Sequence, residues 1–327
     1  MDYRQLGKTG LKVSALGFGC GAVGGLMVKG EYKDMVRAVA RAIEAGITYF
    51  DTARIYGDGK SETNLGRVLA ELKPNIVVGT KVRLRAEDMD DIETAVIESV
   101  EGSLRRLQLE QVDLIQLHNS IAARRGPERG WVTVDDVESV IQAFEKLQQQ
   151  GKIRHWGING LGETDALQRA VSAGNAETVQ CCFNLLNPSA GIQAPPGFPF
   201  QDYGQLIDRA AEQQMGVIAI RVLAAGALSG STARHPNAAQ DVAPIASGEN
   251  LAEDVERAQR FRFLVEEGFA ASLAEAALRF AISKAQVSTA LVGLSNLDQL
   301  EQAIQAANKG PLPSEAIDRL SDIWARR

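Results

Sequence analysis

The apolar residues of the chain fall into eight short segments that are hydrophobic along almost their whole length. Such segments are typical of strands that are buried on both faces, as in a parallel sheet covered by helices. The pattern therefore predicts eight parallel strands, at residues 14–20, 48–52, 76–82, 113–118, 153–159, 178–184, 216–223 and 288–294.

Between these segments the apolar residues recur every three or four positions, which indicates amphipathic helices. Residues 88–107, for example, carry Ile92, Val96, Val100 and Leu104 at intervals of four. Helices are predicted at 33–45, 62–72, 88–107, 134–150, 163–173, 203–214, 252–266, 272–283, 296–307 and 314–325.

Eight strand–helix repeats are the number that closes a TIM barrel, a (β/α)8 fold of about 250 residues. The sequence therefore predicts an α/β fold in which residues 1–327 form a single barrel domain. The additional residues are expected in an N-terminal β-hairpin at 2–14, a long functional loop after the seventh strand at 224–251, and an extra C-terminal helix at 314–325.

Composition narrows the functional class. The 327 residues are 45% hydrophobic and carry a net charge of −6, without an apolar run long enough to span a membrane or a clustered basic face. We therefore expect a soluble protein with no nucleic-acid or membrane partner. Three cysteines, Cys20, Cys181 and Cys182, without zinc-type spacing fit a reducing cytosol and predict no metal site. Composition leaves the oligomeric state open.

Residues 19–24, GCGAVG, match the G-x-G-x-x-G pattern of dinucleotide-binding Rossmann folds. That motif requires a helix to begin within the glycine run, whereas the next helical periodicity begins near Lys33. We therefore expect these glycines to bring the backbone close to a ligand at the barrel mouth, outside any Rossmann fold.

Polar side chains stand where three successive strands end. Asp51 ends the second strand and is followed by Tyr56, Lys81 ends the third, and His118 ends the fourth. Active sites of TIM barrels lie at the carboxyl ends of the strands, so we expect these four residues to form one site.

A phenol beside an ammonium suits proton transfer, because the positive charge stabilises the phenolate and lowers the pKa of the phenol. We expect Asp51 to pair with Lys81, Lys81 to tune Tyr56, and His118 to place a carbonyl oxygen. Such a site interconverts a carbonyl and an alcohol. None of these side chains can carry a hydride, so a nicotinamide cofactor, NADP(H) or NAD(H), is expected.

Two alternatives remain at this point. The first is a Schiff-base barrel lyase, such as an aldolase, in which Lys81 is the nucleophile. The second is a non-catalytic protein that binds a nicotinamide cofactor and senses redox state.

The chain resembles the aldo-keto reductases over nearly its whole length. The resemblance rests on GITYFDTARIYGDGKSETNLGRVL, GTKV, DLIQLH, GKIRHWGIN, TVQCCFNLLNP, LAAGALSG and LVGLSNLDQLEQA. It implies a catalytic tetrad of Asp51, Tyr56, Lys81 and His118, with Tyr56 as general acid and base. It also implies a nicotinamide cofactor extended across the barrel mouth, with the 224–251 loop helping to hold it.

The resemblance further implies which residues contact the cofactor: Gly19, Cys20, Asp51, Asn159, Gln180, Ile220, Arg221, Leu223, Gly226, Gly293, Ser295, Asn296 and Gln299. Three positions depart from the family pattern. Gly160 lacks a side chain that in the family often contacts the nicotinamide amide. Ile220 stands where the family commonly has a tyrosine that stacks on the nicotinamide, and Asn296 stands where NADP-preferring members often have a cation. NADP(H) and NAD(H) therefore both remain candidates. Loop 119–131 is expected to shape substrate specificity.

Overall fold

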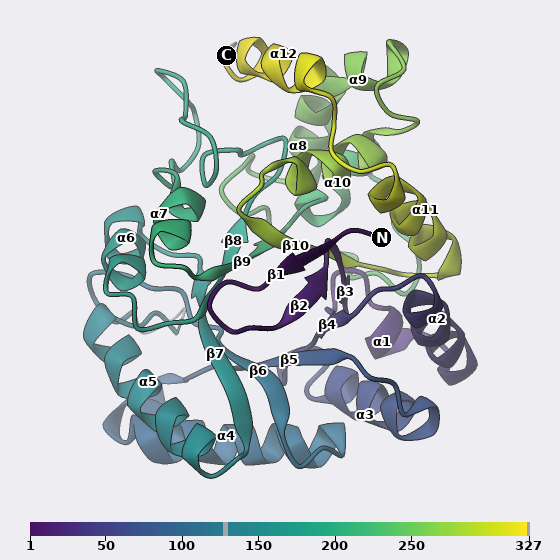
Figure 1. The fold of residues 1–327 in the computed structure, drawn as a ribbon. Coiled ribbons are helices and arrows are strands. Elements are labelled where there is room, and N and C mark those ends of the chain that lie inside the picture. Colours follow the sequence, from purple (N-terminus) through teal and green to yellow (C-terminus); the bar gives the residue numbers. More distant parts are fainter. Residues whose placement is uncertain (127–129, 326–327) are drawn as a thin grey trace.

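The computed structural model describes residues 1–126 and 130–325. Its centre is a closed barrel of parallel strands in the order β10-β3-β4-β5-β6-β7-β8-β9 (Figure 1), which confirms the predicted (β/α)8 class. The barrel strands are β3 (Leu16–Gly19), β4 (Tyr49–Asp51), β5 (Val77–Val82), β6 (Val112–Leu117), β7 (Ile153–Gly160), β8 (Thr178–Cys182), β9 (Gly216–Ile220) and β10 (Val287–Gly293).

Helices surround the barrel because their apolar faces cover its outer surface. The α-helices are α1 (Leu26–Lys29), α2 (Tyr32–Glu44), α3 (Lys60–Leu72), α4 (Ile92–Leu107), α5 (Val134–Gln149), α6 (Thr164–Ser172), α7 (Leu206–Glu212), α8 (Leu251–Ala258), α9 (Phe263–Glu266), α10 (Leu273–Ser283), α11 (Leu297–Asn308) and α12 (Ser314–Trp324). Short 3₁₀ helices are η1 (Ala86–Asp90), η2 (Ala224–Ser229) and η3 (Gln259–Phe261).

The predicted N-terminal hairpin consists of antiparallel strands β1 (Tyr3–Gln5) and β2 (Lys12–Ser14) and lies over the ring of strands in Figure 1. Gly7 at its turn pairs with Met215, immediately before β9, so the hairpin covers the amino ends of the strands. Its buried apolar side chains pack against interior residues of the barrel, including Tyr49 and Leu114. The hairpin therefore closes that end, and the carboxyl ends of the strands remain for a site.

Some local predictions differ from the structure. The sequence pattern does not predict helix α1, because its four residues are too few to show the repeating spacing of apolar residues that marks a helix. The 224–251 connection, expected as a long loop, begins with the short helix η2 and ends at the first residue of α8. The helix expected at 252–266 is divided into α8, η3 and α9, because residues 259–261 tighten into a 3₁₀ turn. Within the described ranges, no helix combines the length and apolar character needed to cross a bilayer.

Candidate active site

The predicted carboxylate–lysine pair lies inside the barrel. Asp51 and Lys81 come from neighbouring strands β4 and β5 and are 1% and 2% exposed. The Lys81 Nζ atom donates to Asp51 Oδ1, to the carbonyl oxygen of Thr52 at 2.7 Å, and to the hydroxyl oxygen of Tyr56 at 3.3 Å. Its three hydrogens therefore have three acceptors, which fixes the ammonium in one position.

The second oxygen of Asp51 is also held. Its Oδ2 accepts hydrogen bonds from the Tyr49 hydroxyl and from Gln180 Nε2, each at 2.8 Å. Space for the Tyr49 hydroxyl depends on Gly79, where an added Cβ would lie 2.6 Å from that oxygen. Asp51 thus has partners from its own strand, from β5 and from β8.

Tyr56 lies in the turn between β4 and α3. The first turn of α3 is tied to the strand ends, because the Ser61 hydroxyl donates to the Cys20 carbonyl at 2.8 Å and lies 2.8 Å from the Thr52 hydroxyl. This anchoring fixes the turn that presents Tyr56.

His118 directly follows β6, and its ring meets that of Tyr56 edge-on, with centroids 5.8 Å apart and planes at 89°. Asn159 Nδ2 donates to the carbonyl oxygen of His118 at 3.2 Å. The structure thus brings Asp51, Tyr56, Lys81 and His118 to one place, as the strand ends predicted.

Burial sets the direction of the pKa shift for Tyr56 and His118, whereas neighbouring groups set it for Lys81. Burial raises the pKa of Tyr56, and although Lys81 lowers it through charge and hydrogen bonding, the net pKa lies above the ordinary value. Burial opposes the charge on Lys81, but Asp51 and Tyr56 outweigh this and raise its pKa. Burial, followed by the charges of Lys81 and Arg83, holds the pKa of His118 well below its ordinary range. The resting site therefore contains a neutral phenol, an ammonium and a neutral imidazole.

A cavity of about 890 Å³ opens beside these groups, at the carboxyl ends of the strands. Tyr56 and His118 line it, while Lys81 lies behind them. Most of the residues predicted to contact a cofactor also line it: Gly19, Asp51, Asn159, Gln180, Ile220, Arg221, Leu223, Gly226, Gly293, Ser295 and Gln299.

Two predicted contact residues lie outside the cavity lining. The Cys20 side chain is buried in the barrel wall, where its backbone carbonyl accepts from Ser61. Asn296 is the N-cap of α11, and its side chain accepts from the backbone N–H of Gln299 at 2.9 Å. Neither side chain lines the space that a cofactor would fill.

Gly24, the last residue of the glycine run, and Gly25, which directly follows the run, are required for a physical reason other than the expected approach to a ligand. A Cβ at Gly24 would lie 2.3 Å from the backbone nitrogen of Leu294, and one at Gly25 would lie 1.9 Å from the carbonyl oxygen of Asn237. Gly25 also has φ of +81°. These glycines therefore allow close packing against the segment after β10 and against the 224–251 connection. Gly21 fits the expectation better, since it lies beside the Tyr56 ring.

Sequence reasoning missed two contributors. Tyr49 was read only as part of an apolar strand, although alternation along β4 places it on the same face as Asp51. Arg234 lies in the Gly-, Ala-, Pro- and Ser-rich connection and also lines the cavity. Both of its terminal nitrogens donate to the Ala225 carbonyl, at 2.9 and 2.8 Å, while its buried Nε has no partner among the described residues. The sequence did carry a signal for Arg234, because it is the one lysine or arginine of residues 224–251.

The loop expected to shape specificity, 119–131, includes residues 127–129, which lie outside the described residues. Of its described part, Ser120 lines the cavity. Within the described chain, no group of three His, Cys, Asp or Glu side chains is arranged to hold a metal ion.

Comparison with known proteins places this geometry in a family. The model of the aldo/keto reductase family matches residues 15–325. An uncharacterized oxidoreductase, YqkF of Bacillus subtilis (strain 168), is 28% identical over 98% of this chain and 95% of its own length. L-galactose dehydrogenase of Arabidopsis thaliana is 31% identical over 99% of this chain and 94% of its own.

Among solved structures, the holo form of the aldo-keto reductase AKR11C1 from Bacillus halodurans superposes with a TM-score of 0.73 at 26% identity. The match covers 99% of this chain and 96% of that one. With a family match from residue 15 to residue 325 and a barrel of the same architecture, the chain belongs to the aldo/keto reductase family, oxidoreductases that use a nicotinamide cofactor.

Proposed function

We propose that this protein interconverts a carbonyl group and an alcohol with NAD(P)(H), and that Tyr56 transfers the proton. The observation that carries the proposal is the hydrogen bond from Lys81 Nζ to the Tyr56 hydroxyl at 3.3 Å, beside the cavity. A phenol held against an ammonium that is itself fixed by a carboxylate is suited to reversible proton transfer.

In reduction, the Tyr56 hydroxyl donates its proton to the carbonyl oxygen of the substrate. Lys81 stabilises the phenolate that remains, because its ammonium is already directed at that oxygen. Asp51 keeps Lys81 protonated and in place. Neutral His118 provides an uncharged hydrogen-bonding group next to Tyr56, which orients the substrate oxygen without competing for the proton.

The cavity suits a dinucleotide, which when bound supplies a hydride to the carbonyl carbon or accepts one from the alcohol. Asn159 Oδ1 is buried and accepts no hydrogen bond from the described residues, so it can accept one from a carboxamide group. Arg221 and Arg234 line the cavity and can balance the charge of a pyrophosphate. The residues present therefore fit a nicotinamide cofactor.

The burial and bonding of Lys81 disfavour a Schiff-base reaction. A nucleophilic lysine must be neutral and reach the substrate, whereas Lys81 is 2% exposed and its pKa is raised, since the effects of Asp51 and Tyr56 exceed that of burial. Borohydride trapping of a substrate on Lys81 would favour that alternative. Tight cofactor binding without turnover of any carbonyl would favour the non-catalytic alternative.

The substrate is a small molecule, namely an aldehyde, a ketone or a sugar. The relative named L-galactose dehydrogenase makes free sugars the first group to test. The test of the proposal is a screen of cofactor oxidation and reduction, in both directions and with both nicotinamide cofactors. Turnover that is lost in Tyr56→Phe supports the proposal, and equal turnover in that variant contradicts it.

A further inference from the structure

Glu62 is a fully buried carboxylate that lies outside the lining of the cavity. It stands in the first turn of α3 and is 0% exposed. Its Oε1 atom accepts a hydrogen bond from the Thr80 hydroxyl at 2.6 Å, and its Oε2 atom accepts one from Arg106 Nε at 2.6 Å. A charge can be buried at low cost only where it is paired and hydrogen-bonded, and both oxygens of Glu62 meet that condition.

The hydrogen bond to Thr80 connects the two elements that carry the reacting pair. Thr80 directly precedes Lys81 on β5, so its side chain points to the opposite face of the strand. Glu62 follows the turn that presents Tyr56, where the backbone N–H of Ser61 donates to the Tyr56 carbonyl oxygen at 3.2 Å. One side-chain hydrogen bond therefore ties the strand of Lys81 to the helix that begins at the Tyr56 turn.

Arg106 ties the same carboxylate to α4 and also packs against the Tyr56 turn. A Cβ at Gly59, which lies in that turn, would be 2.8 Å from Arg106 Cδ. A Cβ at Gly66 would lie 2.6 Å from the Arg106 carbonyl oxygen, so α3 and α4 are in close backbone contact. Helix α4 in turn packs against β5. Arg106 thus holds Glu62 and the turn from the side opposite the cavity.

We propose that Glu62 is a positioning residue for the reaction, because its carboxylate holds the Tyr56 turn at a fixed distance from the strand of Lys81. This inference rests on the proposed function, in which Tyr56 transfers the proton. The hydrogen bond from Lys81 to Tyr56 is at the long end of the usual range, at 3.3 Å. A small outward shift of the turn would therefore break it.

The position of the phenol matters because the groups around it act on its pKa in opposite directions. Burial raises the pKa of Tyr56, and Lys81 lowers it. Asp51 raises that pKa, and Arg221 lowers it. Lys81 donates to the hydroxyl directly, so an outward shift should weaken the effect of Lys81 most. The ionisable side chains that face Tyr56 from the surrounding strands are Tyr49, Asp51, Lys81, His118 and Arg221.

The test measures the pKa of Tyr56 without substrate, from the ¹³Cζ shift of labelled tyrosine between about pH 7 and 12. The chain has five tyrosines, and the Tyr56 signal is assigned by its loss in Tyr56→Phe. Thr80→Val removes the hydroxyl that bonds to Glu62 and changes no charge. The midpoint should rise by roughly 0.3–1 unit, since a close opposite charge shifts a pKa by about 1–3 units and only part of that effect is lost.

Glu62→Gln separates position from charge. One of its partners, Thr80 or Arg106, then faces an NH2 group that cannot accept a hydrogen bond. Loss of a negative charge would by itself favour the phenolate and lower the midpoint, whereas displacement from Lys81 raises it. We expect the midpoint to rise, in the direction of the change in Lys81→Met. If Glu62→Gln does not fold, Thr80→Val decides the question alone.

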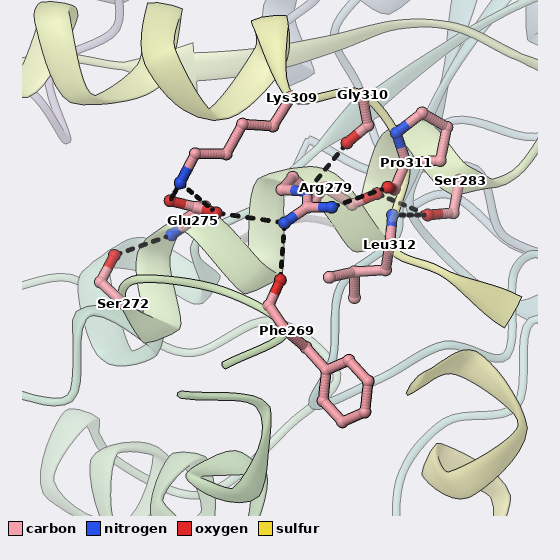
Figure 2. Close-up of polar contacts among 9 residues, drawn as sticks. All are labelled: Phe269, Ser272, Glu275, Arg279, Ser283, Lys309, Gly310, Pro311 and Leu312. Atoms are coloured by element: carbon pink, nitrogen blue, oxygen red, sulfur yellow. Dashed lines mark hydrogen bonds and ion pairs between the residues drawn. The ribbon is translucent and has the colours of Figure 1, made fainter. Parts of the chain in front are cut away.

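Two matched controls separate this effect from a general loss of stability. Thr289→Val makes the same change at a buried strand position whose hydroxyl has no partner among the described residues. Glu275→Gln makes the same change in another buried carboxylate, which Figure 2 shows held by Lys309 at 3.0 and 2.8 Å and by Arg279 at 3.1 Å. Both controls should keep the wild-type midpoint of Tyr56, even where urea unfolding shows a loss of stability.

A wild-type midpoint in Thr80→Val, or a lowered midpoint in Glu62→Gln, overturns the inference and leaves the proposed function intact. A wild-type midpoint in Lys81→Met would overturn both the inference and the tuning of Tyr56 by Lys81. Absence of turnover in the carbonyl screen would contradict the proposed function whatever the midpoint.

Discussion

Lys81 Nζ donates a hydrogen bond to the hydroxyl oxygen of Tyr56 at 3.3 Å, from a position fixed by Asp51 and Thr52. The relationship matters because Tyr56 is buried, and burial alone would strongly disfavour its phenolate. Lys81 offsets part of that effect. The two residues should therefore differ in what their removal does to the reaction.

Tyr56→Phe removes the proton donor but keeps the ring that meets His118. We expect kcat to fall by about 10²- to 10⁴-fold, the usual contribution of general acid–base catalysis. The dissociation constant of the preferred cofactor should remain near that of the wild type, because the hydroxyl is expected to contact substrate. Steady-state kinetics together with a cofactor titration measure both. Wild-type kcat in this variant would reject Tyr56 as the acid.

Lys81→Met should move the pH dependence of alcohol oxidation. Oxidation needs the phenolate, so its rate rises as pH passes the pKa of Tyr56. Lys81 lowers that pKa, and its removal should therefore shift the rising limb to higher pH. Lys146→Met is a suitable control, since Lys146 forms an ion pair with Glu93 on the surface. An unchanged limb in Lys81→Met would exclude Lys81 as the group that tunes Tyr56.

His118 should stay neutral across the physiological range, since burial holds its pKa well below the ordinary value. We expect its ring ¹⁵N shifts to be constant between about pH 6 and 8, where an unperturbed histidine titrates. The chain has three histidines, so the His118 signals can be assigned by their loss in His118→Asn. A midpoint near pH 6.5 would show that His118 is charged in part of this range.

Glu275 should make stability depend on pH. Burial raises its pKa, but hydrogen bonds from Lys309 and Arg279 outweigh this, so the folded-state pKa is lowered. The stabilisation is then present above the unfolded pKa, near about 4.3, and is lost as pH falls through the folded value. Glu275→Gln should cost about 1–3 kcal/mol at pH 7, and less below about pH 4. Urea unfolding at both pH values tests this, and a constant difference would contradict it.

Gly25→Ala should displace the connection after β9. Its Cβ would meet the Asn237 carbonyl at 1.9 Å, and φ is already +81°. Gly151→Ala is the control, because Gly151 has φ of +72° and nothing within 4 Å of an added Cβ. Both should lose about 1 kcal/mol to backbone strain, whereas Gly25→Ala should lose more and also bind cofactor less tightly. If thermal unfolding shows that both variants lose the same stability, the segment at Asn237 moves aside for the added methyl group without a loss of stability.

The sequence was most informative where a pattern repeats. The eight apolar segments predicted the barrel strands, and the strand ends brought Asp51, Lys81 and His118 together. It was less informative where one contact decides the outcome. The hydrogen bond from Tyr49 to Asp51 depends on barrel closure, and the turn at Ala225 depends on Arg234. The net pKa of Tyr56 could not be predicted either, because neighbouring charges are visible in a sequence and the extent of burial is not.

Gly79 limits how this site can change during evolution. Any side chain there would enter the space of the Tyr49 hydroxyl, which supports Asp51, which in turn supports Lys81. A substitution at Gly79, which has no side chain of its own, would thus disturb Lys81 indirectly, through Tyr49 and Asp51. In a library randomised at residue 79 and selected for turnover, glycine should be the residue recovered, while exposed positions such as Gln142 should accept many amino acids.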